Sequence, residues 1–379
     1  MAARHVLVVG AGLNGTATAW QLARRGVQVT LLERDIPAGT QGSSHGSSRI
    51  FRYAYTDPLY ADLVRRARAD WTDLEEVSGV PLLTAHGAVD HGSGRDAAQL
   101  SALLGSLGVR NEVLSAEAAR ERWPHMVFQT PVLFHPDAGA LNARLAAETM
   151  ASLAAASGAD VRTGAEAVAV RRTERGFAVD VVTGSSSALE ETLYPTDVVV
   201  AAGGFLPRLL PTLPLPAEFV RRLPPFRVRK EQIFHFRWRD PDAAWPTFIH
   251  KEPGMQTYGL PGGADADFAG IKVAEFDGGP LISSAADPDR SIDPDNRARV
   301  TAYVREFLPG LDPTPYAEAA CLFTPTPTED FVIDTADHLT LQAACSGHAA
   351  KFAPLLGRLT AAQVLGDEPV PARFRPCSA

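Results

Sequence analysis

The first third of the chain opens with two apolar runs on either side of a helical segment. Residues 5–9 and 27–32 are almost uninterrupted hydrophobic stretches, the pattern of parallel strands that are buried on both faces. Residues 16–25 between them have a helical composition that Gly26 ends. Together these segments predict a βαβ unit.

The rest of the chain alternates helical and strand patterns without a repeat of fixed period. A glycine- and serine-rich loop at 39–53 runs into an amphipathic helix, and helical spacing covers residues 59–77 and 141–156. Apolar or alternating runs predict strands at 160–162, 167–170, 177–182, 197–204, 232–236, 270–274 and 341–344. Residues 206–225 are rich in proline and predict a crossover between two sheets.

The βαβ unit carries a complete dinucleotide-binding motif. Gly10, Gly12 and Gly15 follow the first strand with the GxGxxG spacing, and the second strand ends at Glu33. The first glycine permits a tight turn, the second lets the backbone approach a pyrophosphate, and the third lets the helix pack close to the sheet. The helix N-terminus attracts phosphate, and the acid can bind a ribose diol. The motif alone does not distinguish NAD from FAD.

Composition narrows the class of protein further. A formal net charge of −8 gives no electrostatic support to a nucleic-acid partner. Three cysteines in 379 residues do not form a disulfide framework, and they fit a reducing cytoplasm. The apolar run after Arg4 is too short for a signal peptide or a membrane span. We therefore expect a cytoplasmic globular protein of about two domains.

Lysine is scarce in this chain. Of 36 basic residues only Lys230, Lys251, Lys272 and Lys351 are lysine, whereas arginine occupies the rest. A lysine retained against this bias is more often one whose compact, titratable amine is needed. Each of the four is therefore a candidate functional residue.

Three further segments carry a family resemblance. They are Ser44-His45-Gly46 with Arg49-Ile50-Phe51-Arg52, the stretch from Cys321 to Asp334, and Ser346-Gly347-His348 with Lys351-Phe352. Together they resemble the FAD-dependent amine oxidases that include monomeric sarcosine oxidase, N-methyltryptophan oxidase and pipecolate oxidase. The resemblance covers essentially the whole chain.

The resemblance implies an α/β fold (α+β overall). A Rossmann-like FAD-binding domain of the glutathione-reductase type would be combined with an antiparallel-sheet substrate domain like that of D-amino-acid oxidase. We expect the FAD-binding domain to be discontinuous, comprising residues 1–80, 150–215 and 322–379. The substrate domain would then comprise residues 81–149 and 216–321.

The resemblance also assigns the cofactor and its contacts. The cofactor would be FAD, joined through its 8α carbon to Cys321 by a thioether; an isolated cysteine is otherwise most often a small buried hydrophobe. The expected cofactor-binding residues are Gly10, Gly12, Gly15, Glu33, Arg34, Ser43, Ser44, Arg49, Cys321, Gly347, His348 and Lys351. We expect no metal ion.

The implied reaction is oxidation of the C–N bond of a secondary or cyclic amino acid to an imine. Hydride would pass to flavin N5, and O2 would be reduced to H2O2. The expected catalytic residues are Lys272, Arg49, His45, Arg52, Lys351 and Tyr258. Arg52 and Lys351 would hold the substrate carboxylate, and Lys272 would promote the reaction with O2.

Two positions depart from sarcosine oxidase. Phe276 stands where that enzyme has a pocket histidine, and Phe323 where it has a tyrosine. The loss of both polar groups favours a more apolar, larger or cyclic substrate and argues against sarcosine itself.

Other functions are compatible with parts of the sequence. An NAD-dependent dehydrogenase would use the glycine motif but would leave the Cys321 and Lys351 segments without a purpose. A primary amino-acid oxidase or dehydrogenase that uses FAD, and a flavin-bound regulatory protein without turnover, are further alternatives. For the main interpretation we expect a monomer whose partners are a small amino acid with a free carboxylate and O2, with no membrane partner.

Overall fold

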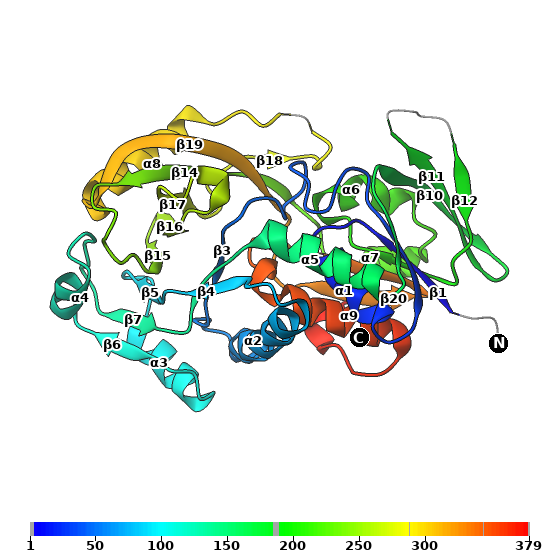
Figure 1. Ribbon diagram of the computed structural model, residues 1–379, viewed down its shortest axis with the longest axis horizontal. Coiled ribbons are helices and arrows are strands. Elements are labelled where there is room, and N and C mark those ends of the chain that lie inside the picture. Colours follow the sequence, from blue (N-terminus) through cyan, green and yellow to red (C-terminus); the bar gives the residue numbers. More distant parts are fainter. Residues whose placement is uncertain (1–3, 185–188, 288, 344, 378–379) are drawn as a thin grey trace.

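The nucleotide-binding motif lies in a largely parallel sheet (Figure 1). The computed structural model of the protein describes residues 4–184, 189–287, 289–343 and 345–377. Within these residues the sheet has the order β20 (Val332–Ala336), β21 (Leu339–Ala343), β13 (Asp197–Val200), β1 (His5–Val9), β2 (Gln28–Leu32) and β9 (Asp160–Arg162). Only β20 is antiparallel to its neighbour in this path. Strand β1 is central, with Val8 paired to Leu31 on one side and Val199 on the other.

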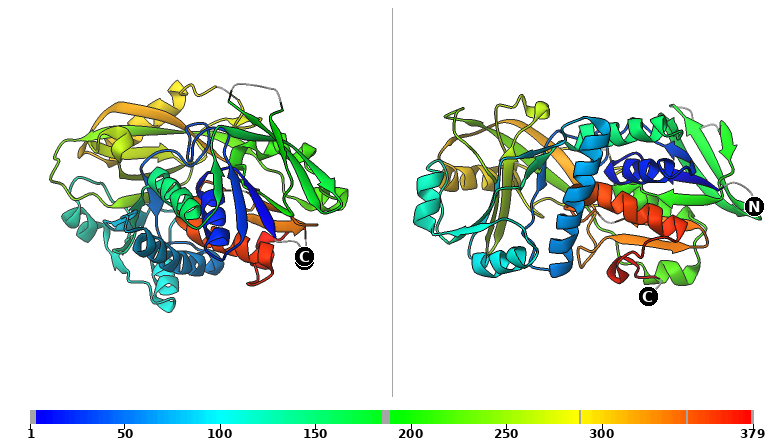
Figure 2. Two further views of the ribbon diagram at one scale, coloured as in Figure 1. Left: turned by 45° about the vertical axis from the view of Figure 1, so that its right-hand side comes forward. Right: turned by 60° about the horizontal axis from the view of Figure 1, so that its bottom comes forward.

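Three helices cover this sheet. Helix α1 (Leu13–Ala23) packs against α5 (Ala143–Ala156) and α9 (Ala353–Leu365), which explains why almost every residue of α1 is buried. The right-hand view of Figure 2 shows α1 and α9 side by side, although they come from opposite ends of the chain. The C-terminal helix therefore helps to hold the helix that carries the glycine motif.

A second, mainly antiparallel sheet lies beside the first (Figure 1). Its order in the described residues is β18 (Leu281–Ile282), β14 (Val228–Trp238), β17 (Gly270–Glu275), β16 (Met255–Pro261), β15 (Thr247–Glu252), β5 (Ala88–His91), β7 (Val132–His135) and β6 (Glu112–Leu114). The long strand β19 (Leu311–Phe323) pairs with β14 and carries Cys321 at its end nearer the first sheet.

Smaller elements complete the described structure. Strands β10 (Ala165–Thr173), β11 (Gly176–Thr183) and β12 (Glu191–Leu193) form one small sheet, and β3 (Arg49–Phe51), β8 (Gly139–Leu141) and β4 (Leu83–Ala85) form another. The remaining helices are α2 (Pro58–Ser78), α3 (Ala97–Ser106), α4 (Ala116–Arg122), α6 (Leu206–Leu209), α7 (Ala217–Arg222) and α8 (Pro294–Phe307). No helix in these stretches combines the length and apolar character that a bilayer crossing requires.

The predicted α/β combination is confirmed, but several element boundaries differ from the expectation. The 39–53 segment is not a simple loop into a helix, because β3 intervenes by pairing with β8. Helix α5 begins at Ala143 rather than 141, since the Asn142 side chain accepts from the Leu145 amide and caps it. Helix α1 begins earlier and ends earlier than predicted. In the strand expected at 341–344, residue 344 lies outside the described residues, and the division into domains stays a prediction.

Candidate active site

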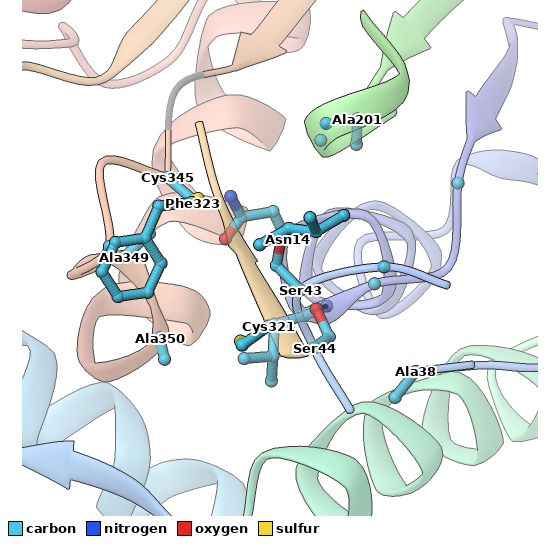
Figure 3. Close-up of a pocket in the computed structure, with 18 of the residues that line it drawn as sticks. Asn14, Ala38, Ser43, Ser44, Ala201, Cys321, Phe323, Cys345, Ala349 and Ala350 are labelled. Atoms are coloured by element: carbon cyan, nitrogen blue, oxygen red, sulfur yellow. Dashed lines mark hydrogen bonds between the residues drawn. The ribbon is translucent and has the colours of Figure 1, made fainter. Parts of the chain in front are cut away.

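A cavity of about 550 Å³ lies between the two sheets. It extends from Gly10 and Glu33 on the first sheet to Tyr258 and Lys272 on the second. Its volume is within the usual range for small-molecule sites. Figure 3 shows Ser43, Ser44 and Cys321 near its centre, with Phe323 and Ala349 on one side and Ala38 on the other.

The glycine motif leaves no room for side chains at the end of the cavity next to α1. A Cβ on Gly15 would lie 1.8 Å from the Gly10 carbonyl oxygen, and one on Gly12 would lie 2.9 Å from Ser44 Oγ. Gly10 has φ +97°, which strains any other residue. The backbone at the start of α1 is thus open to the cavity, and Gly12 at the N-cap position has no side chain that could cap the helix. A phosphate can approach the amide groups there.

Glu33 directly follows β2 and lies beside the glycine motif. Its carboxylate accepts hydrogen bonds from the Ala11 amide at 2.8 Å and the Asp35 amide at 3.0 Å. Burial raises the pKa of this carboxyl. The neighbouring Arg34 guanidinium stacks over Phe205, 4.6 Å from the ring centroid, and both residues line the cavity.

Arg49 connects the glycine- and serine-rich loop to the second sheet. Its guanidinium donates to the Ser48 carbonyl at 3.0 Å and the Ser43 carbonyl at 3.2 Å, and it lies 3.6 Å from Cys321 Sγ. The loop is also tied to α1, because Ser44 Oγ accepts from the Leu13 amide at 3.0 Å. These contacts hold Cys321 beside a fixed cation.

The Cys321 thiol is set up to ionise. Burial alone would raise its pKa, but the Arg49 guanidinium, with His45 and Lys272, lowers it to about 6. The side chain is buried and also lines the cavity. Because the thiolate is the nucleophilic form, this environment favours bond formation by Cys321 at neutral pH.

Lys272 projects from the interior of the second sheet. It lies on β17 between β14 and β16, and its ammonium donates to the Ser48 carbonyl. Burial is the main reason why its pKa is lowered to about 7, and the Arg49 guanidinium lowers it further. The amine therefore changes charge within the physiological range.

Arg52 and Lys351 meet around one tyrosine. The Arg52 guanidinium lies 4.6 Å from the Tyr55 ring centroid, and Lys351 Nζ donates to the Tyr55 hydroxyl at 3.0 Å. Lys351 also donates to the His348 carbonyl at 2.9 Å. Burial, and next the Arg52 charge, lowers the pKa of Lys351 well below its usual value. Two cations held close together in a buried site favour an anionic ligand.

A buried acid behind Arg52 was not predicted. Asp90 is fully buried and faces Arg95 at 2.8 Å, His135 at 3.2 Å and Arg52 at 3.9 Å. Burial opposes its charge, but Arg95, His135 and Arg52 outweigh that effect and lower the pKa of the Asp90 carboxyl. Asp90 therefore stays ionised and restrains Arg52 at the cavity wall.

Most of the predicted site residues line this cavity. They are Gly10, Gly12, Glu33, Arg34, Ser43, Ser44, Arg49, Arg52, Tyr258, Lys272, Cys321, Gly347, His348 and Lys351. Gly15 and His45 do not line it: Gly15 packs on Gly10, and His45 acts on the Cys321 thiol. The individual roles of all these residues stay predictions.

Several residues of the cavity wall were not identified from the sequence as site residues. Lys251, Gln256, Thr257 and Glu329 line the same end as Arg52 and Lys351. The scarcity of lysine was a usable signal for Lys251. Gln256 and Thr257 carried no signal, because their place depends on the pairing of β16, and Glu329 lies in the loop between β19 and β20.

The cavity fits FAD at each of its parts. The glycine cradle and the N-terminus of α1 can hold a pyrophosphate, Glu33 can hold a ribose, and the cavity continues past Cys321 to Lys272. This fold and cavity define a dinucleotide-dependent oxidoreductase with the cofactor between two sheets.

Comparison with known proteins establishes the family. Residues 5–363 match the model of the FAD dependent oxidoreductases, and the chain belongs to this family. It is 32% identical over 399 aligned positions to N-methyl-L-tryptophan oxidase of Yersinia pestis (strain Pestoides F), with 98% of this chain and 99% of that protein covered.

Solved structures show the same fold. NikD, described as an unusual amino acid oxidase essential for nikkomycin biosynthesis, superposes in its open form with a TM-score of 0.84 at 24% identity, covering 98% of each chain. Glycine oxidase of Geobacillus kaustophilus gives a TM-score of 0.77 at 19% identity, again over 98% of both chains. The predictions of the family, of the fold and of FAD as cofactor are confirmed, and FAD is favoured over NAD.

Proposed function

We propose that the protein is an FAD-dependent oxidase that converts the C–N bond of a secondary or cyclic amino acid to an imine. The observation that carries the proposal is one cavity with a dinucleotide cradle at one end and the Arg52–Lys351 pair at the other. Bound FAD supplies the two-electron acceptor, and O2 is the final oxidant and leaves as H2O2. The 32% identity to an N-methyl amino acid oxidase supports this class of substrate.

Arg52 and Lys351 bind and orient the carboxylate of the substrate. The planar guanidinium offers two parallel donors, and the ammonium adds a point charge. Asp90 keeps Arg52 in place, and the Tyr55 hydroxyl and the His348 carbonyl keep Lys351 in place. A carboxylate fixed at this point turns the adjacent C–N bond toward the centre of the cavity.

Lys272 provides a positive charge beside the reacting centre. Its buried ammonium, held by the Ser48 carbonyl, can stabilise negative charge that develops when O2 is reduced. Its pKa of about 7 means that the amine carries this charge below neutral pH and loses it above. Lys272 is thus a candidate for the oxidative half of the reaction.

Apolar groups border the substrate end. Phe276 and Phe323 line the cavity with ring centroids 5.7 Å apart, and Tyr258 lies on the same wall. These rings exclude water around the reacting C–N bond and favour an N-methyl or cyclic substrate larger than sarcosine.

We further propose that FAD is attached covalently through Cys321, which is supported by the lowered thiol pKa and the Arg49 contact at 3.6 Å. Denatured wild-type protein should have the mass of the chain plus the flavin, whereas Cys321→Ala should release its FAD on denaturation. Intact mass spectrometry decides the matter, and a wild-type mass equal to that of the bare chain would refute the link.

We also propose a cytoplasmic monomer. The three cysteines are free, in agreement with a reducing compartment. Light scattering of the purified FAD-loaded protein measures its mass in solution, and a dimer mass would contradict this part of the proposal.

The substrate class is tested by H2O2 release from a panel of N-methyl and cyclic amino acids. Each compound is paired with the amine that lacks its carboxylate. We expect the amino acids to be oxidised and their decarboxylated partners to bind poorly. Arg52→Ala should weaken the binding of carboxylates at least about tenfold, because a charge-assisted hydrogen bond contributes about 1.5–3 kcal/mol.

Lys351→Ala is expected to have the same effect on carboxylate binding. Neither variant should lose much further affinity for the decarboxylated amines. Equal turnover of an amino acid and its decarboxylated amine would instead identify an oxidase of uncharged amines.

A further inference from the structure

One face of the β15–β16 hairpin lines the cavity, and the proposed function gives no role to Lys251 and Gln256 on this face. Ile249 pairs with Tyr258, and Lys251 pairs with Gln256. Directly paired residues, and residues two apart on one strand, share a face of the sheet. All four residues line the cavity. The Lys251–Gln256 pair therefore lies on the same wall as the Ile249–Tyr258 pair, two residues further along each strand.

Lys251 is attracted by the charges of Glu329 and Asp90 without contacting either carboxylate. It is half-buried, and its ammonium makes no hydrogen bond or ion pair with any described residue. Burial, and next the charges of Arg95 and Arg52, lower its pKa to about 8. A half-buried ammonium on a cavity wall that lacks such contacts requires water or a ligand.

The cations at this end of the cavity differ in their contacts. They are Arg52, Arg95, Lys251 and Lys351; the acids Asp90 and Glu329 attract Lys251, and Asp277 and Asp330 act in turn on Glu329. Arg52 and Arg95 face Asp90, and Lys351 donates to Tyr55 and His348. Lys251 has no contact of this kind among the described residues. The substrate carboxylate proposed above is held by Arg52 and Lys351, and it leaves Lys251 available to a second anion.

We propose that Lys251 binds a second carboxylate of the substrate, so that the enzyme acts on a dicarboxylic secondary or cyclic amino acid. This inference rests on the proposed function and names its substrate class. Two residues along a strand span about 7 Å. The second carboxylate is therefore bound about that far along the wall from Tyr258, with the Gln256 amide beside it.

The test measures binding to the FAD-loaded enzyme without turnover. Malonate, succinate, glutarate and adipate are compared with the monocarboxylates of equal length, by the change they cause in the flavin absorbance spectrum. At least one dicarboxylate should bind about tenfold more tightly than its monocarboxylate, a difference of about 1.4 kcal/mol. Lys251→Met should abolish this preference and leave monocarboxylate binding within about twofold of wild type, because it removes only the second contact.

Two control variants separate a specific contact from a general charge effect. Lys251→Arg should keep most of the preference for dicarboxylates. Arg221→Met, which removes an exposed positive charge on α7, should keep all of it. A dicarboxylate preference that survives in Lys251→Met, or no preference in wild type, overturns the proposal.

Turnover distinguishes this inference from the proposed function. N-methyl-L-aspartate and N-methyl-L-glutamate should be oxidised with a higher kcat/KM than N-methyl-L-alanine, and Lys251→Met should remove the difference. If neutral N-methyl amino acids are oxidised equally by both proteins and no dicarboxylate is preferred, only the role of Lys251 is wrong. If dicarboxylates bind through Lys251 but no amino acid is oxidised, the proposed function is wrong and the second anion site stands.

Discussion

The two ends of the cavity are built in different ways. At the nucleotide end the contacts come from backbone, glycine and Glu33, all within one βαβ unit. At the substrate end they come from side chains on β5, β15, β17 and the segment before α9, which the fold brings together. The first end depends on the absence of side chains, and the second on charges held in place by other charges. Substitutions at the two ends should therefore affect different properties of the protein, cofactor binding at the first end and carboxylate binding at the second.

The largest effect is expected for Gly15→Ala. The new Cβ would lie 1.8 Å from the Gly10 carbonyl oxygen, so α1 must move away from β1. We expect purified protein without bound FAD and with a clearly lower melting temperature, measured by absorbance at 450 nm and by thermal unfolding. Gly105→Ala on α3 is the matched control, since open space surrounds that position and alanine favours helix by about 1 kcal/mol. Full FAD content in Gly15→Ala would show that the cradle tolerates side chains.

A smaller effect is expected for Asp90→Asn at the substrate end. The change leaves Arg95 buried without its anion, and the loss of one partner of a buried ion pair costs about 3–5 kcal/mol. FAD should be retained, because Asp90 is remote from the glycine motif, while carboxylates should bind about tenfold more weakly as Arg52 loses its restraint. Denaturant unfolding and inhibitor titration measure the two effects.

The control for Asp90→Asn is Asp62→Asn, which removes an exposed ion pair with Arg65 and should cost no more than about 1 kcal/mol. If Asp90→Asn loses FAD but keeps its affinity for carboxylates, the two ends of the cavity are not independent.

The smallest of the three effects concerns pH and Lys272. Burial lowers the pKa of this amine to about 7, so the ammonium is present below that pH and is lost as the pH rises through it. Reoxidation of the reduced enzyme by O2 should therefore slow with rising pH, by about tenfold. Lys272→Met should be slow at every pH, while anaerobic reduction by substrate changes far less. Stopped-flow measurement of both half-reactions gives the answer, and equal losses in both would remove Lys272 from the reaction with O2.

The contrast also explains what could be predicted from the sequence. The residues of the nucleotide end could be predicted because Gly10, Gly12 and Glu33 lie in one short segment. The hydrophobic pattern of that segment predicts how its strands pair. Lys272 and Cys321 were found through their surrounding motifs and do line the cavity. Asp90 and Gln256 could not be found, because their positions depend on the pairing of β15 with β5 and β16, which no local pattern specifies. Strand β3 was missed for the same reason, since three residues become a strand only by pairing with β8.

The central position of β1 has a consequence for the order of events during synthesis. Strand β1 is made before the other strands of its sheet, but its second neighbour β13 begins at Asp197, and β21 adds to β13 only from Leu339 onward. Helix α9, which packs against α1, is made later still. A chain interrupted before residue 351 thus contains the whole glycine motif but neither the completed helix layer nor Lys351. Pairings this distant in sequence form slowly. We therefore expect the cofactor to be captured only after α9 has been made and packed against α1.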